Sequence, residues 1–159
     1  GRLRGRLMRT FYIATALERA AEAKAIADQL RGFCLGQTYA WDEHGSVQDD
    51  GPERIREVAM NEVSGVLDAD LFVCLLPGGR GTHTELGIAI AGSIERSRHG
   101  YGRNSSRTIV IVGPLEGADG RVCAFYLHPH VDERFANVGE FLAWMRAWRR
   151  CNPLPAVGP

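Results

Sequence analysis

The sequence predicts an α/β fold with a doubly wound, mostly parallel five-stranded sheet of the Rossmann or flavodoxin type. Short apolar segments alternate along the chain with longer segments of helical periodicity, which is the pattern of successive strand–helix–strand units. Residues 71–76 and 108–112 are apolar without polar alternation, as is typical of strands that helices cover on both faces. No internal repeat of roughly 20 to 50 residues is present, so a solenoid is not indicated.

The first half of the chain predicts two strands and two helices. Its alanine-rich segment keeps apolar side chains on one face and stops at Gly32, and Pro52 suits the first turn of a helix. In order, the expected elements are a strand at 10–14, a helix at 17–31, a weaker strand at 37–41, a polar loop at 42–51 and a helix at 52–67.

The second half predicts three further strands and two helices. In order, these are a buried strand at 71–76, a turn at 77–81, a helix at 82–95, a basic mobile loop at 97–106, a strand at 108–112, a short strand at 131–135 and a helix at 138–150. Ligands of such sheets bind beyond the carboxyl ends of the strands. The segments to inspect are therefore 15–19, 41–50, 77–85 and 113–120.

The length of 159 residues fits one domain. We expect residues 1–9 to be a disordered or tag-derived N-terminus, residues 10–150 to form a single α/β domain, and residues 151–159 to be a loose C-terminal tail. No apolar run approaches the roughly 20 residues that a membrane-spanning helix requires, so no membrane association is expected.

The composition argues against several classes of function. Lys plus Arg and Asp plus Glu both number 19, so the formal net charge is zero, which disfavours a dedicated nucleic-acid-binding protein. The four cysteines show no C-x-x-C spacing, which leaves a zinc ribbon unsupported and favours a reduced, cytoplasmic protein. His128 and His130 lack an evident third ligand, so no metal is expected there.

The most informative segment is Pro77-Gly78-Gly79-Arg80-Gly81-Thr82-His83-Thr84-Glu85, which follows a buried strand and opens a helix. Glycines let backbone amides approach a ligand closely, and a helix start adds unpaired N–H donors with partial positive charge. These features predict an anion site, most naturally for a phosphate held by Gly79, Arg80, Gly81 and Thr82. The spacing is neither G-x-G-x-x-G nor that of a P-loop, so a nucleoside triphosphate is not indicated.

Glu85 has two interpretations. In the first, Thr82 caps the helix and Glu85, three residues later, completes a capping box, and the local pattern by itself favours this. In the second, Glu85 is a carboxylate at the mouth of a sheet crevice, where it attacks or stabilises a sugar carbon as the bond to a base breaks. The two roles compete for one side chain, so a catalytic Glu85 must point away from the cap.

Three segments resemble the nucleoside 2-deoxyribosyltransferase superfamily, which includes hydrolases of nucleoside 5′-monophosphates. They are Tyr12-Ile13-Ala14, Ala69-Asp70-Leu71 and Gly81-Thr82-His83-Thr84-Glu85-Leu86-Gly87-Ile88-Ala89, and the resemblance covers residues 10–115. Its most specific part is the pattern G-T-x-x-E-x-G-x-A. The resemblance implies cleavage of an N-glycosidic bond without a metal or redox cofactor, by a homodimer or higher homo-oligomer.

The resemblance also implies roles for individual residues. The glutamate of the pattern is the superfamily's nucleophile at the anomeric carbon, which implies this role for Glu85. An aromatic residue on the first strand and an aspartate before the third strand help to form the site, which implies Tyr12 and Asp70 as the other catalytic residues. Deoxyribosyltransferases commonly carry an aspartate shortly before the glutamate, whereas residues 78–81 contain no acid. This departure favours the nucleotide-hydrolase branch, with Arg19 assisting the phosphate.

A second resemblance is to the cytokinin-activating phosphoribohydrolases, whose P-G-G-x-G-T-x-x-E motif matches residues 77–85. That family has a glycine-rich turn after its first strand, whereas residues 14–18 contain no glycine, so the first family fits better. Both resemblances imply that a base is released from a small-molecule nucleoside 5′-monophosphate. A deoxyribosyltransferase, a phosphoribohydrolase and a non-catalytic nucleotide sensor remain as alternatives.

Several side chains also have a purely structural interpretation. Asp70 can be solvated at a strand start, and Tyr12 can pack under a helix. His83, on a first helical turn, is expected to face solvent, or to contact a phosphate when it is charged. Three arginines near the loop before the fourth strand are expected to be solvated, or to cover a neighbour's phosphate site in an oligomer: Arg98, Arg103 and Arg107.

Overall fold

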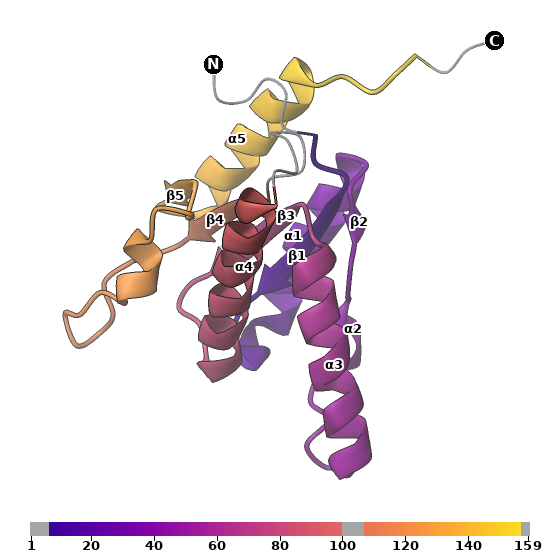
Figure 1. Ribbon diagram of the computed structural model, residues 1–159, viewed down its shortest axis with the longest axis vertical. Helices are drawn as coiled ribbons and strands as arrows, with labels where there is room; N and C mark the ends of the chain where they lie inside the picture. The colour runs from indigo at the N-terminus through magenta and orange to yellow at the C-terminus, as the bar shows by residue number, and fades with distance from the viewer. Residues whose placement is uncertain (1–6, 100–106, 157–159) are drawn as a thin grey trace.

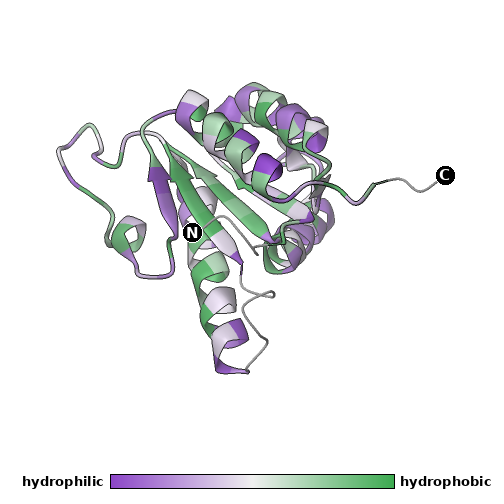
Figure 2. Ribbon diagram, turned by 90° about the horizontal axis from the view of Figure 1, so that it is seen from above, coloured by the Kyte–Doolittle hydropathy of each residue, from purple (hydrophilic) through white to green (hydrophobic). Residues whose placement is uncertain are grey.

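The sheet has five strands in the order β2-β1-β3-β4-β5, and every neighbouring pair is parallel. The structure is a computed structural model that describes residues 7–99 and 107–156. Helices α1 and α5 cover one face of the sheet, and α3 and α4 cover the other (Figures 1 and 2). The expected doubly wound, five-stranded α/β fold is confirmed, and its strand order is that of the flavodoxin type.

The strands are β1 (Thr10–Ala14), β2 (Gly36–Gln37), β3 (Leu71–Leu75), β4 (Thr108–Val112) and β5 (Glu133–Phe135). The helices are α1 (Ala20–Gly32), α2 (Trp41–His44), α3 (Pro52–Asp68), α4 (Arg80–Arg98) and α5 (Val138–Cys151). Two short 3-10 helices are η1 (Leu17–Arg19) and η3 (Ala124–Leu127). None of the helices in the described part of the chain has both the length and the hydropathy needed to cross a bilayer.

The weaker strand expected at 37–41 is wrong in its extent. Only Gly36–Gln37 pair with β1, and helix α2 begins at Trp41, the last residue of the expected strand, and continues into the segment expected to be a loop. The reason is a tertiary contact: the buried Trp41 indole N–H donates a 2.7 Å hydrogen bond to the Ile13 carbonyl. This bond places the Trp41 ring at the end of β1 instead of letting the edge strand continue.

Helix α4 is longer than expected at both ends, because it begins at Arg80 and continues to Arg98. The expected mobile loop at 97–106 therefore starts inside the helix, and residues 100–106 lie outside the described residues. The helix expected at 17–31 begins with the separate turn η1, and β5 starts two residues later than expected.

The core lies on the three central strands, β1, β3 and β4, whose side chains are almost all buried (Figure 2). In the β1–β3 register, Tyr12 lies opposite Phe72, and their rings stack with centroids 6.0 Å apart. Burying an apolar side chain of this size stabilises the fold by about 1.5–3 kcal/mol. The position of the Tyr12 ring is thus fixed by the packing of β1 against β3.

Helix α3 approaches β1 closely at Gly65. A Cβ atom at this position would lie 2.9 Å from the Tyr39 Cβ and 3.1 Å from the Tyr12 ring, so a larger residue would force the helix away. Glu62 lies three residues earlier on the same helix face. The absence of a side chain at Gly65 therefore lets α3 bring Glu62 toward the carboxyl end of β1.

The N-terminal boundary of the domain includes two residues expected to be outside it. Met8 is 3% exposed and packs in the core. The backbone amides of Arg9 and Thr10 donate to the Asp70 carboxylate at 2.8 and 3.2 Å. At the other end of the chain, α5 continues to Cys151.

Arg107 is not solvated, contrary to expectation. Its buried guanidinium donates to the carbonyls of Leu67, Ala69 and Ala89 at 2.5, 3.0 and 2.9 Å. Burial lowers its pKa to about 10. The side chain thereby satisfies backbone oxygens at the end of α3 and within α4, and it joins these two elements. Arg98 is exposed as expected, and Arg103 lies outside the described residues.

We expect Arg107→Ala to lower the free energy of unfolding by about 2–4 kcal/mol, because it removes three hydrogen bonds of a buried guanidinium and opens a cavity. Arg98→Ala, a substitution of an exposed arginine on α4, is the matched control and should change stability by less than about 0.5 kcal/mol. Urea unfolding followed by circular dichroism measures both. Equal effects of the two substitutions would contradict the structural role of Arg107.

Candidate active site

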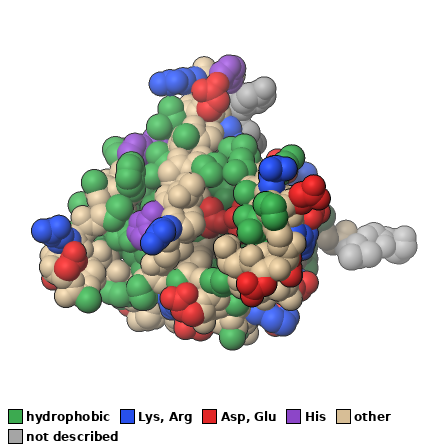
Figure 3. All heavy atoms as spheres, turned by 90° about the horizontal axis from the view of Figure 1, so that it is seen from below, with side chains coloured by type: hydrophobic (Ala, Val, Ile, Leu, Met, Phe, Trp, Pro, Cys, Tyr) green, Lys and Arg blue, Asp and Glu red, His purple; other side chains and the backbone are tan. Residues whose placement is uncertain are grey.

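A cavity of about 430 Å³ opens at the carboxyl ends of β1 and β3. The chain leaves these adjacent strands in opposite directions along the sheet, and parallel sheets bind ligands at such a switch point. Acidic side chains lie near the middle of this face of the molecule (Figure 3). Four segments line the cavity: residues 15–18, 41–48, 55–62 and 79–85.

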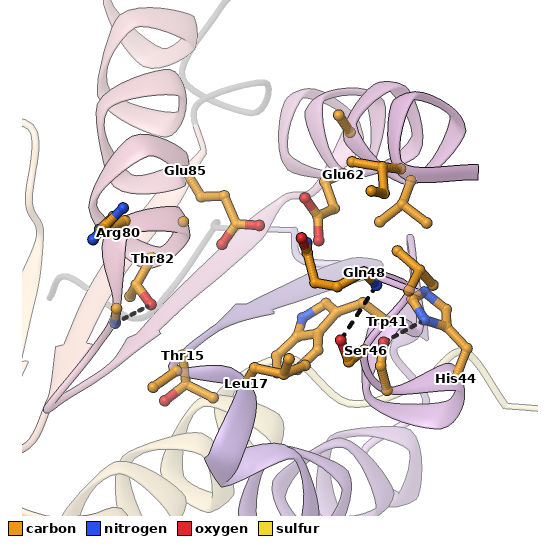
Figure 4. A pocket seen from close by; sticks show the side chains of 18 of the residues that line it. Thr15, Leu17, Trp41, His44, Ser46, Gln48, Glu62, Arg80, Thr82 and Glu85 are labelled. Carbon is orange, nitrogen blue, oxygen red and sulfur yellow. Dashed lines mark hydrogen bonds between the residues drawn. The ribbon is translucent and has the colours of Figure 1, made fainter. Parts of the chain in front are cut away.

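Glu85 and Tyr12 form the central contact of this site. The Tyr12 hydroxyl donates a 2.5 Å hydrogen bond to Oε1 of Glu85, which joins β1 to α4. Glu85 is 8% exposed, and it faces the cavity (Figure 4). Two residues that the sequence predicts as catalytic are thus brought together across 73 positions of the chain.

The environment of Glu85 changes its acidity. Burial raises its pKa to about 8, the Tyr12 hydrogen bond acts in the opposite direction, and the neighbouring Glu62 charge adds to the increase. The pKa of Tyr12 is also raised, chiefly by burial and then by the Glu85 charge, so the phenol keeps its proton and remains a donor. Strongly shifted carboxyl groups in a cavity are typical of catalytic sites.

The capping-box interpretation of Glu85 is wrong. Helix α4 is capped at Gly79, and the Thr82 hydroxyl accepts a 2.9 Å hydrogen bond from the Gly79 amide. Glu85 takes no part in this cap, because its carboxylate is bonded to Tyr12. The helix begins two residues earlier than the sequence pattern suggests, which places Thr82 inside the first turn and Glu85 one turn further along.

The glycine-rich turn lines one end of the cavity with Gly79, Arg80, Gly81 and Thr82. The first turn of a helix leaves amide groups without intrahelical acceptors, and these can bind an anion. A Cβ atom at Gly78 would lie 2.5 Å from Cγ2 of Thr82, so only glycine fits against the buried threonine. The Arg80 side chain is exposed and points away from Glu85 (Figure 4).

Glu62 is a site residue that the sequence analysis missed. It lies on α3, is half-buried, and turns its carboxylate into the cavity toward Glu85 (Figure 4). Burial raises its pKa above the ordinary range of a glutamate. The only sequence signal was its spacing from Gly65 on one helix face, and nothing in the motif at 77–87 points to it.

The far end of the cavity has an aromatic and apolar lining. Trp41, Val47, Ile55 and Val58 contribute to it, and His44 and Gln48 add polar groups. The hydrogen bond from Trp41 to the Ile13 carbonyl fixes the indole ring, which lies beneath Glu62 in Figure 4. A flat, fixed aromatic ring with few polar groups around it suits a planar heterocycle.

Two predicted site residues are not brought to the cavity. Asp70 lies at the amino end of β3, the opposite edge of the sheet, where its carboxylate accepts the amides of Arg9 and Thr10. Arg19 forms a salt bridge with Glu22 at 2.6 Å and donates to the Pro77 carbonyl at 3.1 Å. Arg19 therefore ties the loop after β1 to the loop after β3 and does not line the cavity.

The described residues contain no cluster of three or more His, Cys, Asp or Glu side chains that could hold a metal ion. The imidazoles of His128 and His130 lie 5.6 Å apart without a third such residue beside them in this part of the chain.

The comparisons with known proteins add one informative likeness. No protein-family model matches the chain, and no curated protein does. One solved structure that does match is that of the Clostridium botulinum CMP N-glycosidase BcmB. The two chains share a fold. The TM-score is 0.50 with 17% sequence identity, and the alignment covers 88% of this chain and 99% of BcmB. This likeness confirms the architecture that the superfamily resemblance implied.

We expect Glu85→Gln to stabilise the protein increasingly as the pH rises. Glutamine is uncharged, and its oxygen can still accept the Tyr12 hydrogen bond, so it mimics the protonated carboxyl. Folding raises the Glu85 pKa from 4.5 to about 8, so the native state binds more protons within this window and its free energy of unfolding falls as the pH rises through it. The free energy of unfolding of the variant should therefore equal that of the wild type at about pH 4 and exceed it by on the order of 4 kcal/mol at about pH 9.

Urea unfolding of the wild type and the variant across this pH range measures the difference. Glu53→Gln, at an exposed position in the first turn of α3, is the matched control and should follow the wild type. A difference between Glu85→Gln and the wild type that does not change with pH would contradict the raised pKa of Glu85.

Proposed function

We propose that this protein is an N-glycosidase that hydrolyses a nucleoside 5′-monophosphate to a free base and a sugar 5-phosphate. The observation that carries the proposal is the buried Glu85 carboxylate, which faces the cavity at the switch point with Tyr12 as its hydrogen-bond donor. The shared fold with a CMP N-glycosidase and the sequence resemblance to the superfamily support the same reaction class.

The cavity offers a separate environment for each part of a nucleotide. The turn at residues 79–82 supplies the backbone amides of residues 80–82 for the phosphate, and the region around Trp41 suits a base. Glu85 lies between these two ends, where the sugar would be placed (Figure 4). A volume of about 430 Å³ lies within the range of small-molecule sites.

In the first chemical step, the Glu85 carboxylate attacks the anomeric carbon as the bond from that carbon to the base nitrogen breaks. The electron pair of this bond leaves with the base, and a glycosyl ester of Glu85 forms. Only the ionised carboxylate is a nucleophile. The Tyr12 hydroxyl stabilises that form by donating its hydrogen bond, and it thereby partly offsets the cost of burial.

Glu62 is the proton donor to the leaving base, because Asp70, the second carboxylate that the resemblance implied for the site, lies at the amino end of β3. Its carboxyl faces the cavity, and burial raises its pKa, which favours the protonated form over that of an exposed glutamate. The two carboxyl groups interact, and the form of the pair that reacts is the one in which Glu62 holds the proton while the Tyr12 hydrogen bond stabilises the Glu85 carboxylate. Asp70 keeps the structural role of binding the amides that begin β1.

Hydrolysis is completed when water attacks the anomeric carbon of the ester, with Glu62 now accepting a proton, which releases the sugar phosphate and regenerates the Glu85 carboxylate. A second base in place of water would give a transferase. The absence of an acid in residues 78–81 favours the hydrolase.

The charge of the cavity favours a ligand whose phosphate is held by the backbone. Three carboxyl groups line it, those of Glu18, Glu62 and Glu85, against a single arginine whose side chain points outward. The raised pKa values of Glu62 and Glu85 reduce the negative charge that a phosphate meets near neutral pH. The amides of residues 80–82 then supply most of the attraction.

The direct test is release of free base from a panel of nucleosides and nucleoside 5′-monophosphates that includes CMP and cytidine, read by mass spectrometry. We expect release from monophosphates, and we expect Glu85→Gln to lower kcat by a factor of about 10³ or more, because the amide cannot act as the nucleophile. Glu53→Gln serves as the control with unchanged activity.

Other outcomes would assign another function. Release from unphosphorylated nucleosides only when a second base is added would identify a transferase. Tight nucleotide binding without release of base, unchanged in Glu85→Gln, would contradict catalysis and indicate a nucleotide sensor.

The pH profile tests the part assigned to Tyr12. Since the nucleophile must be ionised, the pH profile of kcat/KM should have a rising limb with its midpoint near the Glu85 pKa of about 8. Tyr12→Phe removes the hydrogen bond that lowers this pKa, so the limb should move up by about one pH unit. Tyr39→Phe, at a tyrosine bonded to His44 instead, is the control. A limb that stays in place in Tyr12→Phe would contradict this role.

A further inference from the structure

His83 does not face solvent freely, contrary to expectation, because both of its ring nitrogens are bonded. Nδ1 lies 2.7 Å from the Gly79 carbonyl oxygen, and Nε2 lies 2.6 Å from the Tyr126 hydroxyl. The two rings are also in contact, with centroids 5.7 Å apart. The side chain thus connects the turn at one end of the cavity to η3, more than 40 residues later in the chain.

The partners of His83 decide the direction of each hydrogen bond. A carbonyl oxygen can only accept, so Nδ1 must carry a proton and donate it to Gly79. In the neutral imidazole, Nε2 is then an acceptor and takes the proton of the Tyr126 hydroxyl. Burial raises the Tyr126 pKa to about 12, so the phenol keeps this proton. Tyr126 therefore selects the tautomer that binds Gly79.

Gly79 is held on both sides by side chains of the same helix. Its amide donates to the Thr82 hydroxyl at 2.9 Å, and its carbonyl accepts from His83. The Gly79 carbonyl and the Arg80 amide belong to one planar peptide unit and point in opposite directions. Holding the carbonyl therefore also fixes the direction of the Arg80 N–H, the first amide of α4 at the cavity.

We propose that His83, supported by Tyr126, is a positioning residue that orients the backbone amides of residues 80–82 for the 5′-phosphate of the substrate. This inference rests on the proposed function, because it assigns the phosphate to that turn. A glycine turn has little intrinsic rigidity, and amides that are ordered before binding avoid the entropy cost of ordering them in the complex. His83 touches the turn and acts only through it.

The same arrangement occurs at the other end of the cavity. Nε2 of His44 lies 2.8 Å from the Tyr39 hydroxyl, and Nδ1 of His44 lies 2.8 Å from the Gly45 carbonyl. Gly45 has a φ of +68°, a conformation that glycine adopts without strain. Each of these imidazoles therefore bridges a tyrosine hydroxyl and the carbonyl of a glycine that lines the cavity. His44 provides a matched comparison, because its pair lies away from the turn at 79–82.

The test compares binding of CMP and cytidine, which differ only in the phosphate, by isothermal titration calorimetry. His83→Leu removes the donor and should weaken CMP binding about 10-fold, the size of one well-aligned hydrogen bond to an anion, while cytidine binding stays within about twofold. His83→Asn should recover most of the CMP affinity, since its amide nitrogen can replace Nδ1. Tyr126→Phe should weaken CMP binding about threefold and leave cytidine binding unchanged. His44→Asn should leave the ratio of the CMP and cytidine dissociation constants unchanged.

Thermal unfolding of each variant separates lost positioning from lost folding. An equal loss of CMP and cytidine binding in folded His83→Leu, or no rescue by His83→Asn, would overturn the inference. A wild type that binds CMP no more tightly than cytidine would overturn it too, because the turn would then hold no phosphate. The expected binding pattern without release of base from CMP would instead leave the positioning role in place and contradict the proposed hydrolysis.

Discussion

The hydrogen bond from the Tyr12 hydroxyl to the Glu85 carboxylate is the contact on which this site depends. It joins β1, one of the three inner strands, to helix α4 where both side chains are buried, and this burial raises the Glu85 pKa to about 8. The fold supplies what this contact needs. The β1–β3 pairing fixes the Tyr12 ring against Phe72, and Gly65 lets α3 approach close enough for Glu62 to face the same cavity.

These positions give the cavity three parts of different chemistry. Backbone amides gather at the start of α4, carboxyl groups occupy the middle, and a fixed indole ring lies at the far end (Figure 4). Side-chain hydrogen bonds hold the two glycine-containing loops, through His83 at one end and His44 at the other. Helix α4 therefore carries the nucleophile and is joined to β1 through Tyr12, while side-chain hydrogen bonds fix the carbonyls of Gly79 and Gly45 at the two ends of the cavity.

The fold and the central residue of the site could be predicted because their signals are local. The uninterrupted apolar runs at 71–76 and 108–112 indicate buried parallel strands, and the motif at 77–87 combines a glycine turn, a helix start and a carboxylate. The β2 region could not be predicted, because a single long-range bond from Trp41 to β1 decides where the strand ends. Local propensity contains no information about such a partner.

The remaining differences have the same origin. Glu62 reaches the cavity because α3 packs closely against β1 at Gly65. Asp70 precedes a strand that the resemblance places at the site, but its side chain lies at the amino end of the sheet and binds backbone amides. His83 and Arg107 look solvated in the sequence, yet each binds main-chain carbonyls that only the folded chain brings near. Polar residues that satisfy buried backbone groups are thus the hardest to assign from sequence.

The central claim is that Glu85 forms the bond to the sugar, and trapping that bond tests it most directly. The protein would be incubated with a CMP analogue that carries fluorine at C2 of the sugar, which destabilises the positively charged transition state and slows breakdown of a glycosyl ester. Peptide mass spectrometry would then locate the adduct. The account predicts a sugar-phosphate adduct on the peptide that contains Glu85, and none in Glu85→Gln. An adduct on Glu62 or another residue, or turnover of the analogue with no adduct on Glu85, would contradict it.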